Sequence, residues 1–275
     1  MPRITYNLRN HKKGIIITWS ILLLTSLILP ILLYLVLKRA ANVSITVVLA
    51  VPTAIFGAPS LFSLGKRTWL LCRKDSDCRP LGSRSRWHMD FFNWNFLINF
   101  IVITVIISVG NAVENPRVCA LGLPVLVTAV GVELLIAIAC EMFGVRAPLR
   151  ISSVAKGERI RGGVYTIAED ICAVDSHGRV RFRQELARRW EASKEVRRLV
   201  VVLDLFWGIS GVAVGGVCIG LMFGSVGEDA AWCIGWGGPW ALAILGGLLT
   251  LGVCKFFLGR EREHLSMPGE VEMKA

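Results

Sequence analysis

The apolar runs of this sequence are poor in charge and hold no histidine. The chain has four histidines, all outside the six longest apolar runs, and the cores of those runs also lack lysine and arginine. Without an imidazole inside a run, a bis-histidine haem has no ligands. A G-x-S-G match at residues 208–211 likewise has no general base for a protease of the rhomboid kind. We therefore expect neither chemistry.

Other motifs that carry chemistry are also missing. The sequence has no G-x-x-x-x-G-K-[ST] phosphate loop, no H-E-x-x-H zinc motif and no D-D-x-x-D diphosphate motif. Cys72 and Cys78 have a Cys-x5-Cys spacing that is not typical of zinc, and only His88 lies near them. We expect no metal ion and no cofactor. No folded basic domain is long enough to bind nucleic acid.

The sequence does contain long stretches of apolar residues. Hydrophobic residues make up 54% of the 275-residue chain, and the mean hydropathy is +0.58. A helix of about 20 apolar residues crosses a bilayer core of about 30 Å. Six segments qualify, at residues 14–37, 44–64, 91–110, 118–143, 199–224 and 231–257. The sequence therefore predicts an all-α polytopic membrane helix bundle, whose main partner is the lipid bilayer.

The basic residues lie on one side of the predicted bundle. Of 31 lysines and arginines, 28 fall in the two tails, the loop after the second segment and the polar block at 144–198, when Lys255 at the end of the sixth segment is counted with the tail that follows it. Because cytoplasmic loops carry such an excess, we expect both termini in the cytoplasm. The first segment is too long for a cleavable signal peptide and is expected to remain as an anchor. The endoplasmic reticulum and the plasma membrane both fit.

This charge pattern divides the chain into four parts. Residues 1–143 form the N-terminal tail and the first four spans, and 144–198 form a cytosolic, amphipathic, basic segment. Residues 199–258 form the last two spans, and 259–275 the cytosolic tail.

The polar block 144–198 shows helical periodicity. Two apolar stripes are visible, the first at Val164, Ile167, Ile171 and Val174 and the second at Phe182, Leu186 and Trp190. The second stretch is rich in arginine on its other face, and such a helix can lie flat on an anionic leaflet. The block is either a connector packed against lipid headgroups and helix ends or a docking site for a cytosolic partner or a phosphorylated lipid.

Two acids inside the apolar runs are the candidate catalytic residues. Glu133 lies about 15 Å from the end of its helix and Asp204 about 7.5 Å, at 1.5 Å per residue. A charged carboxylate near the bilayer centre costs about 2.5–3.5 kcal/mol, so such a group is protonated, paired or facing water. Asp204 is placed to meet either Asn95 on the third segment or a snorkelling arginine.

Polar and aromatic residues near these acids predict a cavity. The candidate ligand-binding residues are Asn95, Asn99, Trp94 and Trp207, joined by the tryptophans of the sixth segment. A neutral carboxylic acid donates a proton and an aromatic face stabilises a cation, which is the chemistry of an embedded isoprenoid cyclase. A proton-coupled carrier fits as well. The alternative is that each acid is hydrogen-bonded and only fixes the packing.

Several further features have simpler interpretations. The tryptophans at 232, 236 and 240 are either interfacial anchors or part of a ligand site. The glycines of the fifth segment allow helices to approach closely, within one chain or in a dimer. Cys119 and Cys233 fall at the same end of their helices and would pair in an oxidising lumen. Asn42 begins an N-x-S sequon beside the membrane.

Three short motifs carry a resemblance to known sequences. They are N-L-R-N-H-K-K-G at 7–14, R-I-S-S-V at 150–154, and G-V-Y followed by E-D and A-V-D within 163–175. Together they resemble a family of polytopic integral membrane proteins of filamentous fungi. The family's usual proline before G-V-Y is Gly162 here, and Ser176-His177-Gly178 stands where a glycine run is usual. The resemblance implies a membrane fold and transfers no activity.

The leading functional expectation is an accessory membrane protein that binds a lipophilic small molecule between its helices. Its setting would be a fungal secondary-metabolite pathway. The alternatives are an embedded cyclase or isomerase that uses Glu133 or Asp204 as an acid, and a proton-coupled transporter.

Overall fold

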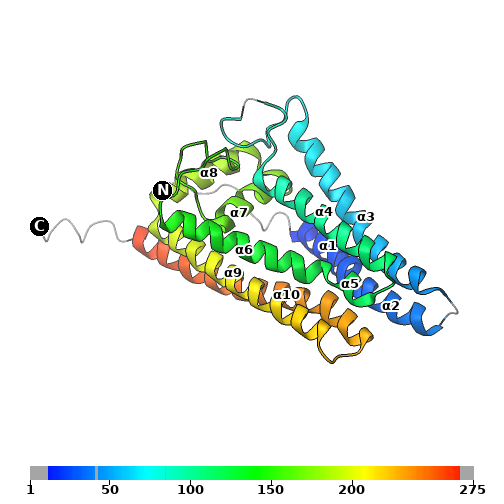
Figure 1. Ribbon diagram of the computed structural model, residues 1–275. Helices are drawn as coiled ribbons and strands as arrows, with labels where there is room; N and C mark the ends of the chain where they lie inside the picture. The colour runs from blue at the N-terminus through cyan, green and yellow to red at the C-terminus, as the bar shows by residue number, and fades with distance from the viewer. Residues whose placement is uncertain (1–11, 41–42, 84, 267–275) are drawn as a thin grey trace, which may run out of the picture.

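The computed structural model describes residues 12–40, 43–83 and 85–266, and this part of the chain is helical with no β-strand (Figure 1). Two isolated β-bridges, Arg146–Arg159 and Ile151–Val154, lie between α6 and α7. The elements are α1 (Lys12–Leu23), the π-helical η2 (Leu24–Ile28), α2 (Leu29–Ala40), α3 (Ile45–Cys72), α4 (Phe91–Ala112), α5 (Pro116–Ala120), α6 (Gly122–Met142), α7 (Gly163–Val174), α8 (Arg179–Ala192), α9 (Lys194–Phe223) and α10 (Glu228–Ser266).

The six predicted spans are confirmed. The described residues contain six helical stretches long and apolar enough to cross a membrane, which are Trp19–Arg39, Ile45–Cys72, Phe91–Ala112, Pro116–Met142, Lys194–Phe223 and Glu228–Glu261. Their outer surface is apolar: Leu245, Leu248 and Leu249 of α10, for example, are exposed. Only a lipid solvent makes such exposure favourable. The protein is therefore a multi-pass membrane protein.

Two of the spans run further into the polar region than the sequence predicted. We expected the second span to end at residue 64, before Lys66 and Arg67, but α3 continues to Cys72. Arg67 is buried among carboxylates, so its charge does not end the helix. Similarly, α9 begins at Lys194, where the side chain of Ser193 accepts a hydrogen bond from the Val196 amide.

Helices α6, α9 and α10 pack side by side along the bundle, and glycines bring α6 and α9 together (Figure 1). A Cβ added at Gly131 would lie 2.9 Å from the Gly208 carbonyl, and one at Gly211 would lie 2.9 Å from the Val127 carbonyl. These glycines therefore serve packing within one chain, which is one of the two expected roles.

The tryptophans of α10 are core residues. Trp232 is fully buried and Trp236 is 2% exposed, so the expectation of interfacial anchors or ligand contacts was wrong for these two. Trp232 stacks on Tyr34 with ring centroids 4.3 Å apart. Its indole N–H donates to the Pro30 carbonyl (3.1 Å), which ties α10 to α2.

Proline chemistry explains a second tie between α10 and the first span. Pro30 has no N–H, so the carbonyl four residues earlier, at Ser26 in η2, loses its usual α-helical donor. Trp240 donates its indole N–H to that carbonyl at 3.1 Å. A side chain of the last span thus bonds to the π-helical turn of the first span.

The polar block 144–198 folds against one end of the bundle, where α7 and α8 lie beside α4, α6 and α9 (Figure 1). Phe182 and Trp190 of α8 are buried, and Trp190 packs with Tyr165 at 4.8 Å between ring centroids. Protein covers this stripe, so α8 cannot use it to lie on the leaflet. The block contacts the ends of the neighbouring helices, as a connector would.

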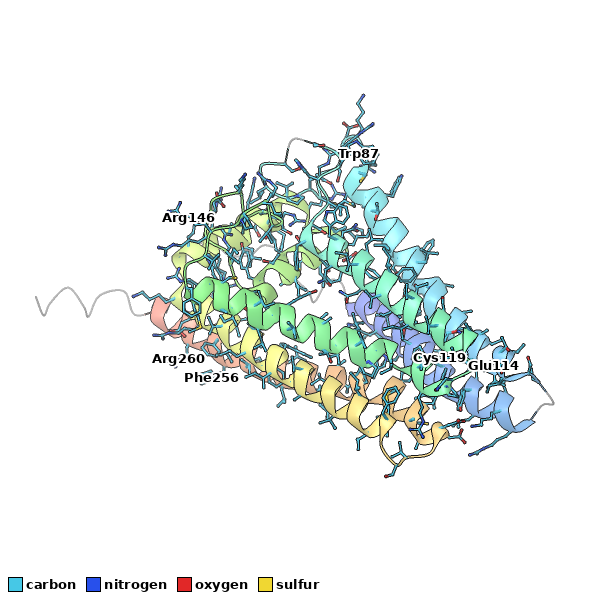
Figure 2. The ribbon with its side chains drawn as sticks, viewed as in Figure 1. Trp87, Glu114, Cys119, Arg146, Phe256 and Arg260 are labelled. Atoms are coloured by element: carbon cyan, nitrogen blue, oxygen red, sulfur yellow. The ribbon has the colours of Figure 1, made fainter. Side chains whose placement is uncertain are left out.

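The two ends of the bundle differ in chemistry. Figure 2 places Glu114 and Cys119 at one end and Arg146 and Arg260 at the other. At the Glu114 end, Lys38 pairs with Asp229 (2.6 Å). Arg117 donates to the Val226 carbonyl (2.6 Å) beside the turn between α9 and α10. Lys38 and Arg117 are therefore used within the fold.

Candidate functional site

Glu133 is held by an amide chain from α4. Asn95 donates a hydrogen bond from its Nδ2 to the Glu133 carboxylate. Asn99 in turn donates to the Asn95 carbonyl and to its Oδ1, both at 3.0 Å. The structure therefore brings three of the predicted site residues together. This arrangement satisfies the carboxyl from within the bundle, as a packing role requires.

Asp204 has a different partner from those expected. Its Oδ1 accepts a hydrogen bond from the Val164 amide at 2.7 Å, in the first turn of α7, while Asn95 is bonded to Glu133 instead. The N-terminus of a helix carries unpaired N–H groups and a partial positive charge, both of which favour a carboxylate. Asp204 therefore docks α7 of the polar block onto α9.

The second oxygen of Asp204 faces another carboxylate. Asp204 Oδ2 and Glu141 Oε2 are both buried and have no hydrogen-bond partner. A Cβ added at Gly162 would lie 2.4 Å from the first atom and 3.0 Å from the second. Both acids thus converge on Gly162.

The two tryptophans named with these acids have other neighbours. Trp94 is 49% exposed on α4. Trp207 donates from Nε1 to Thr250 (3.0 Å), and a Cβ added at Gly246 would lie 2.7 Å from its ring. Trp207 therefore joins α9 to α10, and these contacts do not place it beside Glu133 or Asp204.

A buried ionic cluster lies where the polar block meets α3 and α4. Its members are Arg67, Asp90, Glu169, Asp170 and Arg183. Arg67 pairs with Asp90 at 2.7 Å, and Arg183 pairs with Asp170 at 2.6 Å and with Glu169 at 3.0 Å. Arg183 also reaches Asp90 at 3.3 Å. The cluster joins four separate parts of the chain through groups that are nearly inaccessible to solvent.

The same cluster caps α4. Asp90 is the N-cap residue of α4 and accepts from the Asn93 amide at 2.9 Å. Asp170 accepts from the Phe92 amide (3.1 Å) and from the Ser152 hydroxyl (2.5 Å). Carboxylates at a helix N-terminus satisfy its unpaired N–H groups. The polar block therefore supplies part of the cap of a membrane span.

Burial dominates the electrostatics of the cluster. It raises the pKa of Asp90 to about 6, with the nearby Asp170 carboxylate adding to the rise and Arg67 and Arg183 opposing it. Burial also raises the pKa of Glu169. The neighbouring carboxylates raise the pKa of Arg183 further against the opposing effect of burial, so this guanidinium stays charged. Acids outnumber guanidinium groups here, and one added proton reduces the excess negative charge.

Sequence reasoning missed this cluster. Arg67 and Arg183 were counted as loop charges, and the buried face of α7 was expected to be an apolar stripe. The buried face holds Tyr165, Glu169 and Asp170 beside Val174 of that stripe. One pointer existed, because two adjacent acids stand within the helical stretch that carries the stripe.

An apolar groove lies between α3 and α4. It has a volume of about 320 Å³. Small residues of α3 form one side, and aromatic and aliphatic side chains form most of the rest, with two threonines, a serine and an asparagine among them; it is lined by Ala50, Thr53, Ala54, Phe56, Gly57, Ala58, Leu61, Phe100, Ile103, Thr104, Ile107, Ser108 and Asn111. Asn111 donates from Nδ2 to the Ile107 carbonyl (2.9 Å), but its Oδ1 is buried without a partner. A residue at the α5 end of the groove thus has an unsatisfied acceptor, which is buried beneath the groove surface.

Comparison with known sequences gives a family. A family model described as a domain of unknown function, DUF8766, matches residues 1–265. The chain belongs to the DUF8766 family. Searches of curated proteins and of solved structures gave no match.

In this DUF8766 protein the expected disulfide between Cys119 and Cys233 is not formed, and both residues are free thiols. Cys119 is fully buried at the side of α4, where a Cβ added at Gly110 would lie 2.6 Å from its sulfur. Its thiol is therefore packed against α4. The sequon residue Asn42 lies outside the described residues. Among the residues described, no group of three or more His, Cys, Asp or Glu side chains is arranged to hold a metal ion.

Proposed function

We propose that this protein is an accessory membrane helix bundle that binds a lipophilic small molecule carrying a hydroxyl group. The proposed site is the groove between α3 and α4. The resemblance to fungal membrane proteins adds a proposed setting, in which the ligand belongs to secondary metabolism. The charge asymmetry supports a topology with both termini in the cytoplasm.

The size and lining of the groove support this proposal. Small-molecule sites have volumes of about 300–1,000 Å³, mostly apolar walls and a few polar groups that fix orientation. The groove is about 320 Å³, and its polar side chains are few. Thr53 and Thr104 bond to carbonyls of their own helices, at 2.9 Å and 2.7 Å. An elongated apolar molecule fits this space better than a polar one.

The observation that carries the proposal is the unpartnered acceptor of Asn111. A buried polar atom without a hydrogen bond costs about 1–3 kcal/mol, so such atoms are rare unless something fills the vacancy. A rotation of the Asn111 side chain would turn its buried Oδ1 toward the groove, where a ligand hydroxyl at the α5 end would donate to it and satisfy it. The preferred ligand is therefore an alcohol with its apolar part along α3.

The other functions raised by the sequence stay predictions. An embedded cyclase or a proton carrier needs Glu133 or Asp204 to face a cavity, and neither acid lines the α3–α4 groove. Their bonds to Asn95 and to the Val164 amide favour a structural role. Docking of a cytosolic partner on the polar block also stays a prediction.

Photolabelling tests the proposal. The full-length protein in detergent is labelled with a diazirine derivative of dodecanol and, separately, with its methyl ether, and labelled peptides are mapped by mass spectrometry. We expect labelling of α3 and α4 by the alcohol, and at least fivefold less by the ether, because only the alcohol donates to Asn111. Asn111→Leu should remove the preference for the alcohol.

A matched pair of variants controls for folding. A Cβ added at Gly57, inside the groove, or at Gly65, outside it on the same helix, meets nothing within 4 Å. Gly57→Leu should fill the groove and block labelling, whereas Gly65→Leu should leave it unchanged. Equal labelling of both variants, or equal labelling by alcohol and ether, would show that the groove is not the proposed site.

A further inference from the structure

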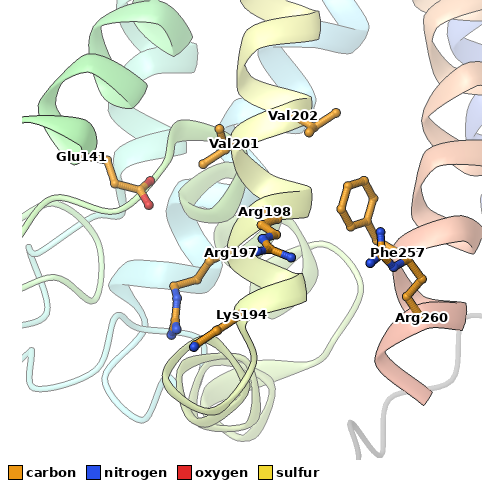
Figure 3. A pocket seen from close by; sticks show the side chains of 8 residues that line it. All are labelled: Glu141, Lys194, Arg197, Arg198, Val201, Val202, Phe257 and Arg260. Carbon is orange, nitrogen blue, oxygen red and sulfur yellow. The ribbon is translucent and has the colours of Figure 1, made fainter. Parts of the chain in front are cut away.

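A second cavity lies between the start of α9 and the end of α10, at the end of the bundle that carries the polar block (Figure 3). Its volume is about 710 Å³. The side chains that line it are four cations, one acid and three apolar residues, namely Lys194, Arg197, Arg198, Arg260, Glu141, Val201, Val202 and Phe257. The cavity is distinct from the α3–α4 groove and shares no residue with it.

We call this cavity the basic pocket. Its lining has four cations and one acid, and this positive charge favours an anion. Figure 3 shows Arg198 on α9 and Arg260 on α10 on the two sides of the gap, with Glu141 beyond α9 on the other side. Arg198 uses its Nη1 for Glu195 (2.9 Å), but a guanidinium has five N–H donors. Arg260 lies over the Phe256 ring, 5.7 Å from its centroid, which limits the positions of its guanidinium. Two guanidinium groups from two helices are suited to hold one phosphate.

The remaining wall of the basic pocket is apolar and continues into the lipid-facing surface. Val202 and Phe257 form this wall. Further along α9, Leu205 and Ile209 are exposed, and both belong to a membrane span. A ligand with its phosphate at the arginines therefore has an apolar path toward the bilayer interior. A soluble phosphate would leave this wall uncovered.

We propose that the basic pocket binds the headgroup of an anionic phospholipid. Arg198 and Arg260 hold the phosphate, Lys194 adds positive charge, and an acyl chain lies along Val202 and Phe257. Basic pockets between helices at the edge of the bilayer are suited to such headgroups, with about 1 kcal/mol gained per basic residue. The lipid would bridge α9 and α10 where they enter the polar region. This site is independent of the function proposed above.

Lipid competition tests the proposal. The full-length protein is placed in mixed micelles with equal amounts of phosphatidic acid and phosphatidylcholine, and bound lipid is counted by native mass spectrometry. We expect phosphatidic acid to be enriched on the protein. Arg198→Gln combined with Arg260→Gln should reduce the enrichment by about 25-fold, from about fivefold for each arginine.

A charge-matched control separates a site from general attraction. Arg86→Gln combined with Arg146→Gln removes the same charge from two other exposed arginines. This control should keep the enrichment, and both double variants should keep the thermal stability of the parent. No enrichment in the parent, or equal loss in both variants, would overturn the proposal.

A second arm distinguishes a lipid from a free phosphate. Glycerol 3-phosphate carries a phosphate monoester without acyl chains, and millimolar amounts should not displace phosphatidic acid. Phe257→Ala should weaken phosphatidic acid binding by shortening the apolar wall. Displacement by glycerol 3-phosphate, together with no effect of Phe257→Ala, would mean that the pocket takes a soluble phosphate and would refute the lipid site.

Discussion

Asp204 on α9 accepts a hydrogen bond at 2.7 Å from the backbone amide of Val164, the second residue of α7. An acid inside a membrane span thereby fixes the start of a helix in the polar block. Loss of a helix cap costs about 0.5–2 kcal/mol, and the cost rises when a buried N–H loses its acceptor.

This bond predicts a difference between two substitutions. Asp204→Ala should release α7 and increase cleavage of residues 144–198 by added protease several-fold, whereas Asp204→Asn keeps an acceptor oxygen and should have a much smaller effect. Limited proteolysis in detergent measures both. Equal damage from the two variants would argue against capping. Normal proteolysis with loss of a transport or cyclase activity would point to a chemical role.

The bond between Trp240 and Ser26 predicts a coupled pair. Trp240→Phe removes the donor and leaves the Ser26 carbonyl unsatisfied, at a cost of about 1–3 kcal/mol. In a Pro30→Ala background the new N–H at residue 30 supplies that carbonyl, so Trp240→Phe should cost less. Thermal unfolding of the four proteins in a double-mutant cycle measures the coupling. If the stability losses of Trp240→Phe and Pro30→Ala simply add, the missing N–H of Pro30 is not the reason that the Trp240 indole stabilises the protein.

Close packing of α6 and α9 predicts opposite outcomes for two glycines of α9. Gly211→Ala places a methyl group 2.9 Å from the Val127 carbonyl, so the helices must separate, and the loss should be about 1–3 kcal/mol. Gly216→Ala meets nothing within 4 Å and should be neutral or slightly stabilising. Thermal stability in detergent compares them. A similar loss for both would mean that helix propensity, and not contact, decides the effect.

The ionic cluster predicts a pH dependence. The pKa of Asp90 is raised from 3.8 to about 6, so between these values the folded protein binds more protons than the unfolded chain. Stability should therefore rise as pH falls through 6 and level off near 4. We expect the polar block to resist protease better at pH 5 than at pH 7.

Asp90→Asn should reduce this pH dependence, since residue 90 then no longer titrates. Glu114→Gln, at the other end of the bundle, is the control and should keep it. If the parent protein becomes less resistant to protease as the pH falls from 7 to 5, the raised pKa of Asp90 is contradicted. If protease resistance depends on pH in Asp90→Asn as it does in the parent, a group other than Asp90 is responsible for the pH dependence.

The spans could be predicted from sequence because lipid imposes a length and a composition that few other environments require. The same reasoning failed where charge is buried by protein. Arg67 looked like the end of a span, yet it lies inside α3 because Asp90 and the Asp170 carbonyl solvate it. Such pairing joins residues far apart in sequence, and periodicity contains no information about it.

The candidate site, too, could be predicted from the sequence only in part. The partial burial of Glu133 and the full burial of Asp204 follow from their place in apolar segments, but their partners depend on how helices rotate about their axes. Asn95 turned toward Glu133 and not toward Asp204. The groove between α3 and α4 depends on helix separation, which the small residues Ala50, Ala54 and Gly57 permit without fixing its size.

Arg67 also has a consequence for the order in which the protein is made. Its carbonyl acceptor, on Asp170, follows it by 103 residues, so the ribosome delivers Arg67 long before that partner exists. During this interval Arg67 has no such acceptor, and a positive charge beside a span is of the kind that influences how the span is oriented. In the folded protein the same guanidinium is buried. The partner that makes its burial favourable is thus made much later than the arginine itself.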